Sequence, residues 1–195
     1  MAKVSAIILG AGLSRRMGEE NKLFLPIGGK PMIEWVIQHV GSAGVDEIIL
    51  VGSELSLDRL KKFENTRTKV VDNPDYQSGM TSSIQAGVEM AAGDGYMICL
   101  GDQPNIKTPT YDVLLDAFSS NPAAIVLPFY QGEKGNPVIL PKVFHADILA
   151  HEEPEGCKGI VMANKELVIQ VDVDDPGVLQ DIDTKTDYDN QVNPA

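Results

Sequence analysis

The chain has 195 residues, of which 43% are hydrophobic and 23% are charged, and its formal net charge is −12. This length and composition are typical of one folded domain over residues 1–195 and argue against wholesale disorder. The acidic balance argues against a nucleic-acid partner, which would favour a basic face. No stretch approaches the roughly 18 continuous apolar residues of a membrane span, and neither a signal peptide nor a disulfide framework is evident. We therefore expect a cytoplasmic protein with no membrane partner.

Strand-like and helix-like segments alternate along the chain, a pattern typical of a mostly parallel sheet covered by helices on both faces. The expected strands are residues 4–9, 47–51, 68–71, 96–100, 123–130, 138–140 and 167–173. The expected helices are one starting at Pro31, 57–63, one opened by Gly79, 109–118, 141–150, 159–164 and a last one capped by Thr184. In the helix after Gly79, the spacing of Met80, Ile84 and Val88 predicts that all three face the core.

The first candidate site follows the apolar run Val4–Leu9. Gly10, Ala11 and Gly12 leave the backbone bare, so that main-chain N–H groups can approach an anion. Arg15, Arg16 and Lys22 come next and can neutralise a polyphosphate. A dinucleotide fingerprint would need glycine at Arg15, and the P-loop spacing is missing. A triphosphate site remains, with an ordinary solvated loop as the alternative.

Three aspartates are candidate metal ligands. Asp102 comes just after the expected strand 96–100, where open α/β sheets bind ligands, and Mg²⁺ prefers one or two carboxylates with phosphate oxygens. The alternative for Asp102 is a turn residue that binds backbone N–H groups. Asp181 and Asp183 share one side of an extended segment, and either could join Asp102; the alternative is a solvated strand end before a helix.

A fourth feature combines Asn73 with the helix start Gly79-Met80-Thr81-Ser82-Ser83. Exposed N–H groups and hydroxyls at a helix start can bind a phosphate, a ribose or a base edge. They can equally form an ordinary N-cap.

Taken in order, these segments resemble the MobA-like nucleotidyltransferases, and most closely the molybdenum cofactor cytidylyltransferases. The resemblance implies a three-layer α/β/α Rossmann-like fold of the glycosyltransferase-A type, with residues 1–104 binding the nucleotide and residues 105–190 binding the acceptor. The motifs that carry it are Leu9 to Gly18 with Lys22, Asn73-Pro74, Gly79 to Ser83, Leu100 to Pro104, Gly135 to Val138, and Asp175-Pro176-Gly177 to Asp181-Ile182-Asp183-Thr184.

The same resemblance implies the reaction and the roles of residues. A terminal phosphate of the acceptor attacks the α-phosphate of a nucleoside triphosphate and displaces pyrophosphate. The implied catalytic residues are Arg16, Lys22 and Asp102, of which Arg16 and Lys22 hold phosphates. Asp102 and Asp183 hold Mg²⁺, with Mn²⁺ as an alternative metal and Asp181 as the less favoured second acid. The residues implied in nucleotide binding, besides Arg16, Lys22 and Asp102, are Leu9, Gly10, Ala11, Gly12, Asn73, Gly79 and Ser83.

Two details bear on the substrates. Ala11 stands where guanylyltransferase relatives carry glycine, and its methyl narrows the space beside the base, which favours CTP over GTP. The implied acceptor, molybdopterin, would meet Gly135, Asn136, Pro137 and Lys158. Asn136 replaces the usual histidine, and Cys157 replaces an acid, so other phosphorylated acceptors (sugar or polyol phosphates, phospholactate) remain alternatives.

A non-catalytic nucleotide-binding chaperone that delivers a cofactor is the alternative from another functional class. The resemblance also suggests a molybdoenzyme or a chaperone as a protein partner. For the chain itself we expect a monomer or a weak dimer.

Overall fold

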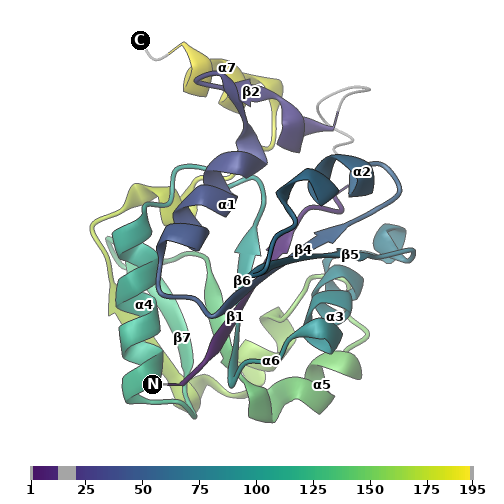
Figure 1. Ribbon diagram of the computed structural model, residues 1–195. Coiled ribbons are helices and arrows are strands. Elements are labelled where there is room, and N and C mark those ends of the chain that lie inside the picture. The colour runs from purple at the N-terminus through teal and green to yellow at the C-terminus, as the bar shows by residue number, and fades with distance from the viewer. Residues whose placement is uncertain (1, 13–20, 194–195) are drawn as a thin grey trace.

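A computed structural model describes residues 2–12 and 21–193. Eight of the described strands form one sheet in the order β10-β7-β9-β6-β1-β4-β5, with β8 paired to β7 (Figure 1). The expected mostly parallel sheet is confirmed, although β9 runs antiparallel to β6 and β7, and β8 antiparallel to β7. The strands are β1 Val4–Leu9, β4 Glu47–Gly52, β5 Thr68–Asp72, β6 Gly95–Leu100, β7 Ile125–Tyr130, β8 Glu133–Lys134, β9 Val138–Pro141 and β10 Val168–Asp172.

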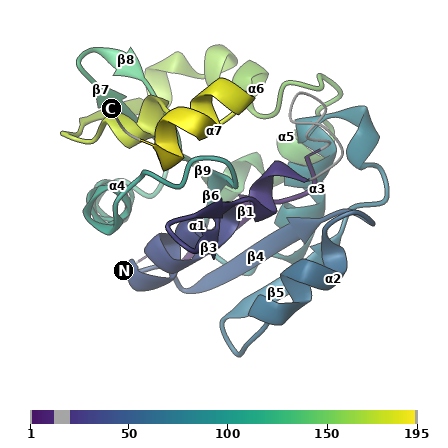
Figure 2. The ribbon, with the colours of Figure 1, turned by 90° about the horizontal axis from the view of Figure 1, so that it is seen from above.

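Helices cover both faces of the sheet, which gives three layers (Figure 2). One face carries α1 (Met32–Ser42), α2 (Leu57–Leu60) and α4 (Thr108–Ser120), and the other carries α3 (Met80–Met90), α5 (His145–Leu149) and α6 (Lys158–Ala163). Successive strand residues point to opposite faces. Thus Ile8 packs under α1 and α4, whereas its neighbour Ile7 packs under α3.

Residues 26–31 and the last helix lie together beyond one end of the sheet. The short strands β2 (Pro26–Ile27) and β3 (Lys30–Pro31) form a separate antiparallel pair. The last helix, α7 (Lys185–Val192), lies beside β2 at the top of Figure 1. The Tyr188 hydroxyl donates to the Pro26 carbonyl over 2.7 Å, which ties the end of the chain to an early loop.

Several local expectations need correction. Pro31 is the N-cap of α1 rather than its first helical residue. Residues 141–150 do not form one helix, because a 3-10 turn at Lys142–Phe144 precedes the short α5. Met80 does not face the core. Met80, the first residue of α3, is 42% exposed and lines the cavities described below, whereas Ile84 and Val88 are buried in the core as expected.

The topology brings two loops to one place. The chain builds outward from β1 to β4 and β5, then returns to place β6 on the other side of β1. Such a switch point leaves a crevice at the carboxyl ends of the two strands. The loops after Leu9 and after Leu100 both begin there. Among the described residues, no helix combines the length and apolar character that crossing a membrane requires.

Candidate nucleotide and metal site

A cavity of about 260 Å³ opens at the carboxyl ends of β1 and β6. Lys22 and Asp102 stand at its polar side, and Ala11 with Gly12 forms part of its wall. The complete lining consists of Leu9, Ala11, Gly12, Lys22, Leu23, Tyr76, Gln77, Gly79, Met80, Ser83, Leu100, Gly101 and Asp102. The fold therefore brings the first motif, the start of α3 and Asp102 together around one space.

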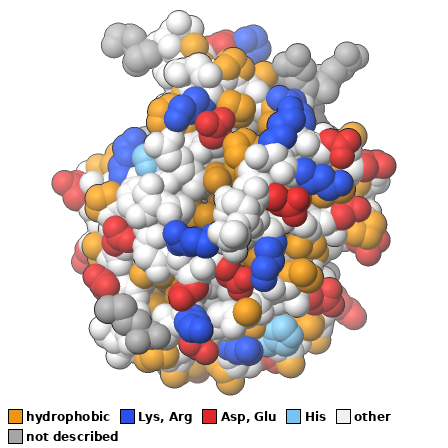
Figure 3. Space-filling view, in the orientation of Figure 1, with side chains coloured by type: hydrophobic (Ala, Val, Ile, Leu, Met, Phe, Trp, Pro, Cys, Tyr) orange, Lys and Arg blue, Asp and Glu red, His pale blue; other side chains and the backbone are white. Residues whose placement is uncertain are grey.

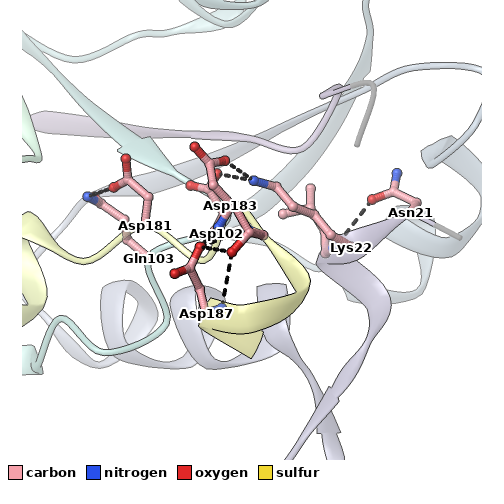
Figure 4. A network of polar contacts seen from close by, with 9 residues as sticks. Asn21, Lys22, Asp102, Gln103, Asp181, Asp183 and Asp187 are labelled. Atoms are coloured by element: carbon pink, nitrogen blue, oxygen red, sulfur yellow. Dashed lines mark hydrogen bonds and ion pairs between the residues drawn. The ribbon is translucent and has the colours of Figure 1, made fainter. Parts of the chain in front are cut away.

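Lys22 binds two of the candidate acids. Its Nζ lies 2.7 Å from Asp102 Oδ2 and 2.6 Å from Asp183 Oδ1 (Figure 4). The Lys22 side chain is 11% exposed and that of Asp102 is 19% exposed, so this ion pair is largely shielded from water. Asp183 is more open, at 43%. The early loop, the end of β6 and the late segment thus share one charged cluster.

Local structure holds the lysine in place. Lys22 opens a 3-10 turn whose next two residues, Leu23 and Phe24, are buried in the core. The Asn21 carboxamide oxygen caps this turn by accepting from Leu23 N over 3.1 Å. Since the turn is capped and anchored, the direction in which Lys22 leaves the backbone is set by its neighbours.

Asp183 is held from both sides. Before it, Ile182 is buried, and its N–H donates to the Asp102 carbonyl over 3.0 Å. After it, Thr184 caps α7 through a capping box with Asp187, as the sequence predicts for Thr184. The Asp187 carboxylate also accepts from Asp183 N at 3.3 Å (Figure 4).

The charges of the cluster follow from its partners. Burial acts to lower the pKa of Lys22, but attraction to Asp102 and hydrogen bonds to Asp102 and Asp183 outweigh it and raise that pKa above 10.5. The lysine therefore stays a cation. Burial and the repulsion of Asp102 raise the pKa of Asp181, although a hydrogen bond from Gln103 opposes the shift.

The residues present fit a divalent cation. Asp102 Oδ1 is buried and has no hydrogen-bond partner among the described residues, so its lone pairs are available. The structured parts of the chain contain no cluster of three or more His, Cys, Asp or Glu side chains suited to an ion. Asp102 and Asp183 would therefore supply two ligands, as Mg²⁺ commonly requires when substrate phosphates supply others.

Some expected nucleotide-binding residues stand behind the cavity wall. Gly10 does not line the cavity, and a Cβ there would lie 3.0 Å from both Leu60 and the Val51 carbonyl oxygen. Asn73 is also outside the lining; it is buried and donates to the Ser82 and Ser83 hydroxyls. Ser83 does line the cavity. Arg15 and Arg16 lie outside the described residues.

Gly79 joins the cavity to the second half of the chain. Its φ of +124° is unfavourable for side-chain-bearing residues, and a Cβ there would lie 2.7 Å from Pro154 Cβ. The next N–H, of Met80, donates to the Pro154 carbonyl over 3.0 Å. The start of α3 thus packs directly on the loop that precedes Cys157.

A second cavity of about 180 Å³ adjoins the first and shares Met80 and Leu100 with it. Its floor is apolar, with Lys134, Asn136 and Lys158 contributing polar groups. The complete lining is Met80, Ile84, Ile98, Leu100, Leu127, Lys134, Asn136, Val138, Glu155, Cys157, Lys158 and Val161. Two expected acceptor-binding residues, Asn136 and Lys158, line it, whereas Gly135 and Pro137 do not.

The second cavity is short of negative charge. Burial raises the pKa of the Cys157 thiol to about 12, so this side chain is neutral. Glu155 is the single acid in the lining, and its carboxylate lies 3.1 Å from Lys158 Nζ. Lys134 adds a further cation. The chemistry of this cavity suits an anionic ligand with an apolar body.

Six residues that line the first cavity were not among the predicted site residues: Leu23, Tyr76, Gln77, Met80, Leu100 and Gly101. Tyr76 and Gln77 belong to a 3-10 turn (Tyr76–Ser78). Gln77 Nε2 donates to the Tyr76 hydroxyl, which in turn donates to Glu54 Oε1 over 3.0 Å. The signal that could have found them is their position between Asn73 and Gly79.

The surface outside these cavities shows no segregation of charge on the face drawn in Figure 3, where Lys and Arg side chains are interspersed with Asp and Glu. It gives no sign of a basic stripe on that face.

The model of the MobA-like NTP transferase domain matches residues 6–167. The chain belongs to that family. It is accordingly a nucleotidyltransferase by descent, with the α/β nucleotidyltransferase fold that the resemblance predicts. Because the match begins within β1 and ends just before β10, it spans both cavities.

Two relatives are similar to this chain over more than nine-tenths of their length. The molybdenum cofactor cytidylyltransferase of Escherichia coli K12 is 24% identical over 96% of this chain and 95% of its own. The nicotine blue oxidoreductase of Paenarthrobacter nicotinovorans is also 24% identical, over 93% of this chain and 92% of its own. Since relatives at equal identity carry different names, similarity establishes the family, and the substrates must be argued from the site.

Solved structures agree with the fold. Rv0371c of Mycobacterium tuberculosis H37Rv, solved in complex with manganese, superposes with a TM-score of 0.78 at 19% identity and covers 99% of this chain and 100% of its own. A nucleotidyl transferase from Methanothermobacter thermautotroptrophicus superposes with a TM-score of 0.81 at 23% identity, and the match covers 95% of this chain and 94% of its own. At these identities the likeness concerns the fold.

Proposed function

We propose that this protein transfers CMP from CTP to the phosphate of a small acceptor, with release of pyrophosphate and with Mg²⁺ bound by Asp102 and Asp183. The observation that carries the proposal is the position of the Lys22–Asp102–Asp183 cluster at the polar side of the first cavity, next to the wall formed by Ala11 and Gly12. A triphosphate entering there would meet the cation Lys22 and the expected metal ligand Asp102, while Asp183 lies next to them on Lys22.

The roles of the residues follow from their charges. Lys22 is a shielded cation, so it can stabilise the negative charge that develops on the phosphoryl oxygens during transfer. A bound Mg²⁺ would neutralise phosphate charge and orient the in-line displacement. An acceptor oxygen bonds to the α-phosphorus while the bond to the β-phosphate oxygen breaks, and pyrophosphate leaves with that electron pair. Because a phosphate monoester is already anionic, no side chain needs to act as a base.

The preference for CTP rests on Ala11. Its side chain is 2% exposed and lines the cavity, so its methyl takes up space that glycine would leave open. A smaller pyrimidine base fits better beside that methyl than a purine does. Gly79 and Ser83 line the same cavity, which supports a role for them in binding the base or the ribose.

The acceptor side rests on the second cavity. Asn136 and Lys158 line it, and the shared residues Met80 and Leu100 make it continuous with the first. An acceptor phosphate directed toward Asp102 would leave its organic part over the apolar floor. The acceptor that we propose is molybdopterin, which the family resemblance implies, and sugar and polyol phosphates are the alternatives that the assay must exclude.

The test is pyrophosphate release in the presence of Mg²⁺, with each of the four nucleoside triphosphates and with molybdopterin set against sugar and polyol phosphates. We expect the highest kcat/KM with CTP and molybdopterin. Equal or better use of GTP would overturn the nucleotide assignment, and better use of a polyol phosphate would overturn the acceptor assignment.

A variant connects the activity to the site. Asp102→Asn keeps the size of the side chain but removes its charge, and we expect it to lower kcat by about 10²- to 10³-fold and to weaken Mg²⁺ binding. The matched control is Asp112→Asn, on α4, whose Oδ1 accepts from Gly44 N far from either cavity. Unchanged turnover in Asp102→Asn would mean that the site is not catalytic.

A further inference from the structure

Gln103 comes directly after Asp102 and is 1% exposed. Its Nε2 donates to Asp181 Oδ1 (Figure 4). The same Nε2 lies 3.5 Å from the Val178 carbonyl oxygen, to which it also donates. One buried side chain next to the expected metal ligand therefore binds two points of the late segment that leads to Asp183.

The hydrogen-bond pattern determines the orientation of this carboxamide. Gln103 Oε1 is buried and finds no hydrogen-bond partner within the described part of the chain. Turning the amide over would satisfy no additional group, and it would set the oxygen against the Asp181 carboxylate and the Val178 carbonyl, which are both acceptors. Only the observed orientation lets the amide donate to the segment.

This contact distinguishes two acids that residue spacing alone leaves equivalent. Asp181 and Asp183 are two positions apart, and the N–H of Ile182 between them donates to the Asp102 carbonyl. With that backbone bond in place, Asp181 is bound to Gln103 on one side of Asp102, while Asp183 reaches Lys22 on the other (Figure 4).

We propose that Gln103 is a positioning residue that binds Asp181 outside the metal site and so makes Asp183 the partner of Asp102. Gln103 acts through Asp181 and touches neither metal nor nucleotide. The proposal rests on the metal role given to Asp102 and Asp183 under the proposed function. It further states that Asp181 contributes a hydrogen-bond acceptor and not a metal ligand.

Substitutions at Asp181 separate these roles, with Mn²⁺ affinity in the presence of CTP measured by electron paramagnetic resonance. Asp181→Asn retains an oxygen that accepts from Gln103, and we expect its Mn²⁺ affinity to equal that of the unmodified protein. Asp181→Leu removes the acceptor, and we expect Mn²⁺ binding about tenfold weaker, as is typical when a group that orients a metal ligand is lost. Asp181 is exposed, so neither change disturbs the core.

Exchanging the amide of Gln103 and the carboxylate of Asp181 tests the contact itself. Gln103→Glu sets a carboxylate against that of Asp181, and we expect Mn²⁺ affinity to fall about tenfold. In Gln103→Glu/Asp181→Asn the new amide can donate to the new carboxylate, so we expect the affinity to return. Gln180→Glu is the matched control, since it makes the same change at the residue next to Asp181, where the side chain contacts Asn105 and not Asp181, and its affinity should be unchanged.

The outcomes separate this proposal from the proposed function. Loss of Mn²⁺ affinity in Asp181→Asn, to the level of Asp102→Asn, would make Asp181 a metal ligand and overturn the proposal. Unchanged affinity in Asp181→Leu would also overturn it, since the contact would then position nothing. If the unmodified protein bound no Mn²⁺ in the presence of CTP, the result would overturn the metal role of Asp102 and Asp183 under the proposed function, on which the role of Gln103 rests.

Discussion

The Lys22 ammonium lies 2.7 Å from the carboxylate of Asp102, a residue 80 positions later in the chain. The same ammonium lies 2.6 Å from Asp183. It therefore stands between the two carboxylates that are expected to hold a divalent cation. An ammonium and a metal ion cannot both neutralise the same oxygens fully, so Lys22 and the metal should compete until phosphates arrive to bind the lysine.

Because of this competition, we expect replacement of Lys22 to strengthen metal binding and to weaken catalysis. Lys22→Met removes the ammonium while keeping much of the side-chain volume, and we expect Mn²⁺ to bind about tenfold more tightly in the absence of nucleotide, a change of about 1.4 kcal/mol. With CTP and acceptor present, we expect kcat/KM to fall at least about 10²-fold, because the phosphates lose a shielded cation. Calorimetric titration with Mn²⁺ and a pyrophosphate assay measure the two effects.

The control for Lys22→Met is Lys61→Met, since Lys61 is an exposed lysine paired with Asp58 on the surface. Lys61→Met should change neither the Mn²⁺ affinity without nucleotide nor kcat/KM. Weaker Mn²⁺ binding by Lys22→Met without nucleotide would show that the lysine supports the metal site rather than competing for it.

The buried methyl of Ala11 predicts a change in nucleotide preference. Ala11→Gly should enlarge the cavity beside the base and lower the ratio of kcat/KM for CTP to that for GTP by about tenfold, within the range that one methyl group can discriminate. Steady-state pyrophosphate release with each nucleotide measures the ratio. Ala43→Gly makes the same change at a buried position at the end of α1. This control should leave the ratio of kcat/KM for CTP to that for GTP unchanged. A ratio that rises in Ala11→Gly would contradict the assignment of the base pocket.

We expect the hydrogen bonds of Thr81 to affect binding of the acceptor but not binding of CTP. Its hydroxyl donates to the Glu153 carbonyl and accepts from Gly156 N at 3.0 Å, which fastens the loop before Cys157 to α3. Thr81→Val has nearly the same shape but loses both bonds. We expect it to reduce the free energy of unfolding by about 2 kcal/mol and to raise KM for the acceptor, with little change in KM for CTP.

Thr81→Ser keeps the hydroxyl and is the control for that experiment. It should preserve KM for both substrates, while the loss of a methyl lowers stability slightly. A rise of KM for CTP alone in Thr81→Val would mean that the loop serves the nucleotide and not the acceptor.

Glu47 predicts a dependence of stability on pH. Burial acts to raise its pKa, but hydrogen bonds from Lys69, Ser5 and the Ala92 N–H outweigh burial and lower the pKa below 4.5. A carboxylate whose pKa is lowered by folding adds stability above its unfolded pKa and loses it as the pH falls through the folded value. Glu47→Gln should therefore lower the free energy of unfolding by about 1 kcal/mol near pH 7, and the difference should shrink toward zero as the pH falls well below 4.5.

Urea denaturation at several pH values measures this effect. Glu89→Gln, at an exposed position of α3, is the matched control and should give a curve parallel to that of the unmodified protein. A difference between Glu47→Gln and the unmodified protein that grows as the pH falls would reverse the sign we derive.

The sequence by itself determined the layers and the order of most elements. Apolar runs such as Val4–Leu9 are long enough to be buried on both faces, and the helix periodicity of Ile33, Val36 and Val40 requires a sheet to pack on. Local chemistry also determined the cap at Thr184. These features depend on neighbours within a few residues, which is why pattern reasoning finds them. The exposure of Met80 escaped it, because a helical repeat does not say where a cavity opens beside the helix.

The site depended on contacts between distant parts of the chain. Residue spacing named Asp102, Asp181 and Asp183 as acids but treated the last two alike, since alternation along an extended segment is local. Only the folded chain sets Asp183 on Lys22 and Asp181 on Gln103. It likewise moved Gly10 and Asn73 behind the cavity wall and brought Tyr76 and Gln77 to it. Which carboxylate meets which cation is decided by the packing of loops that are adjacent in space and far apart in sequence.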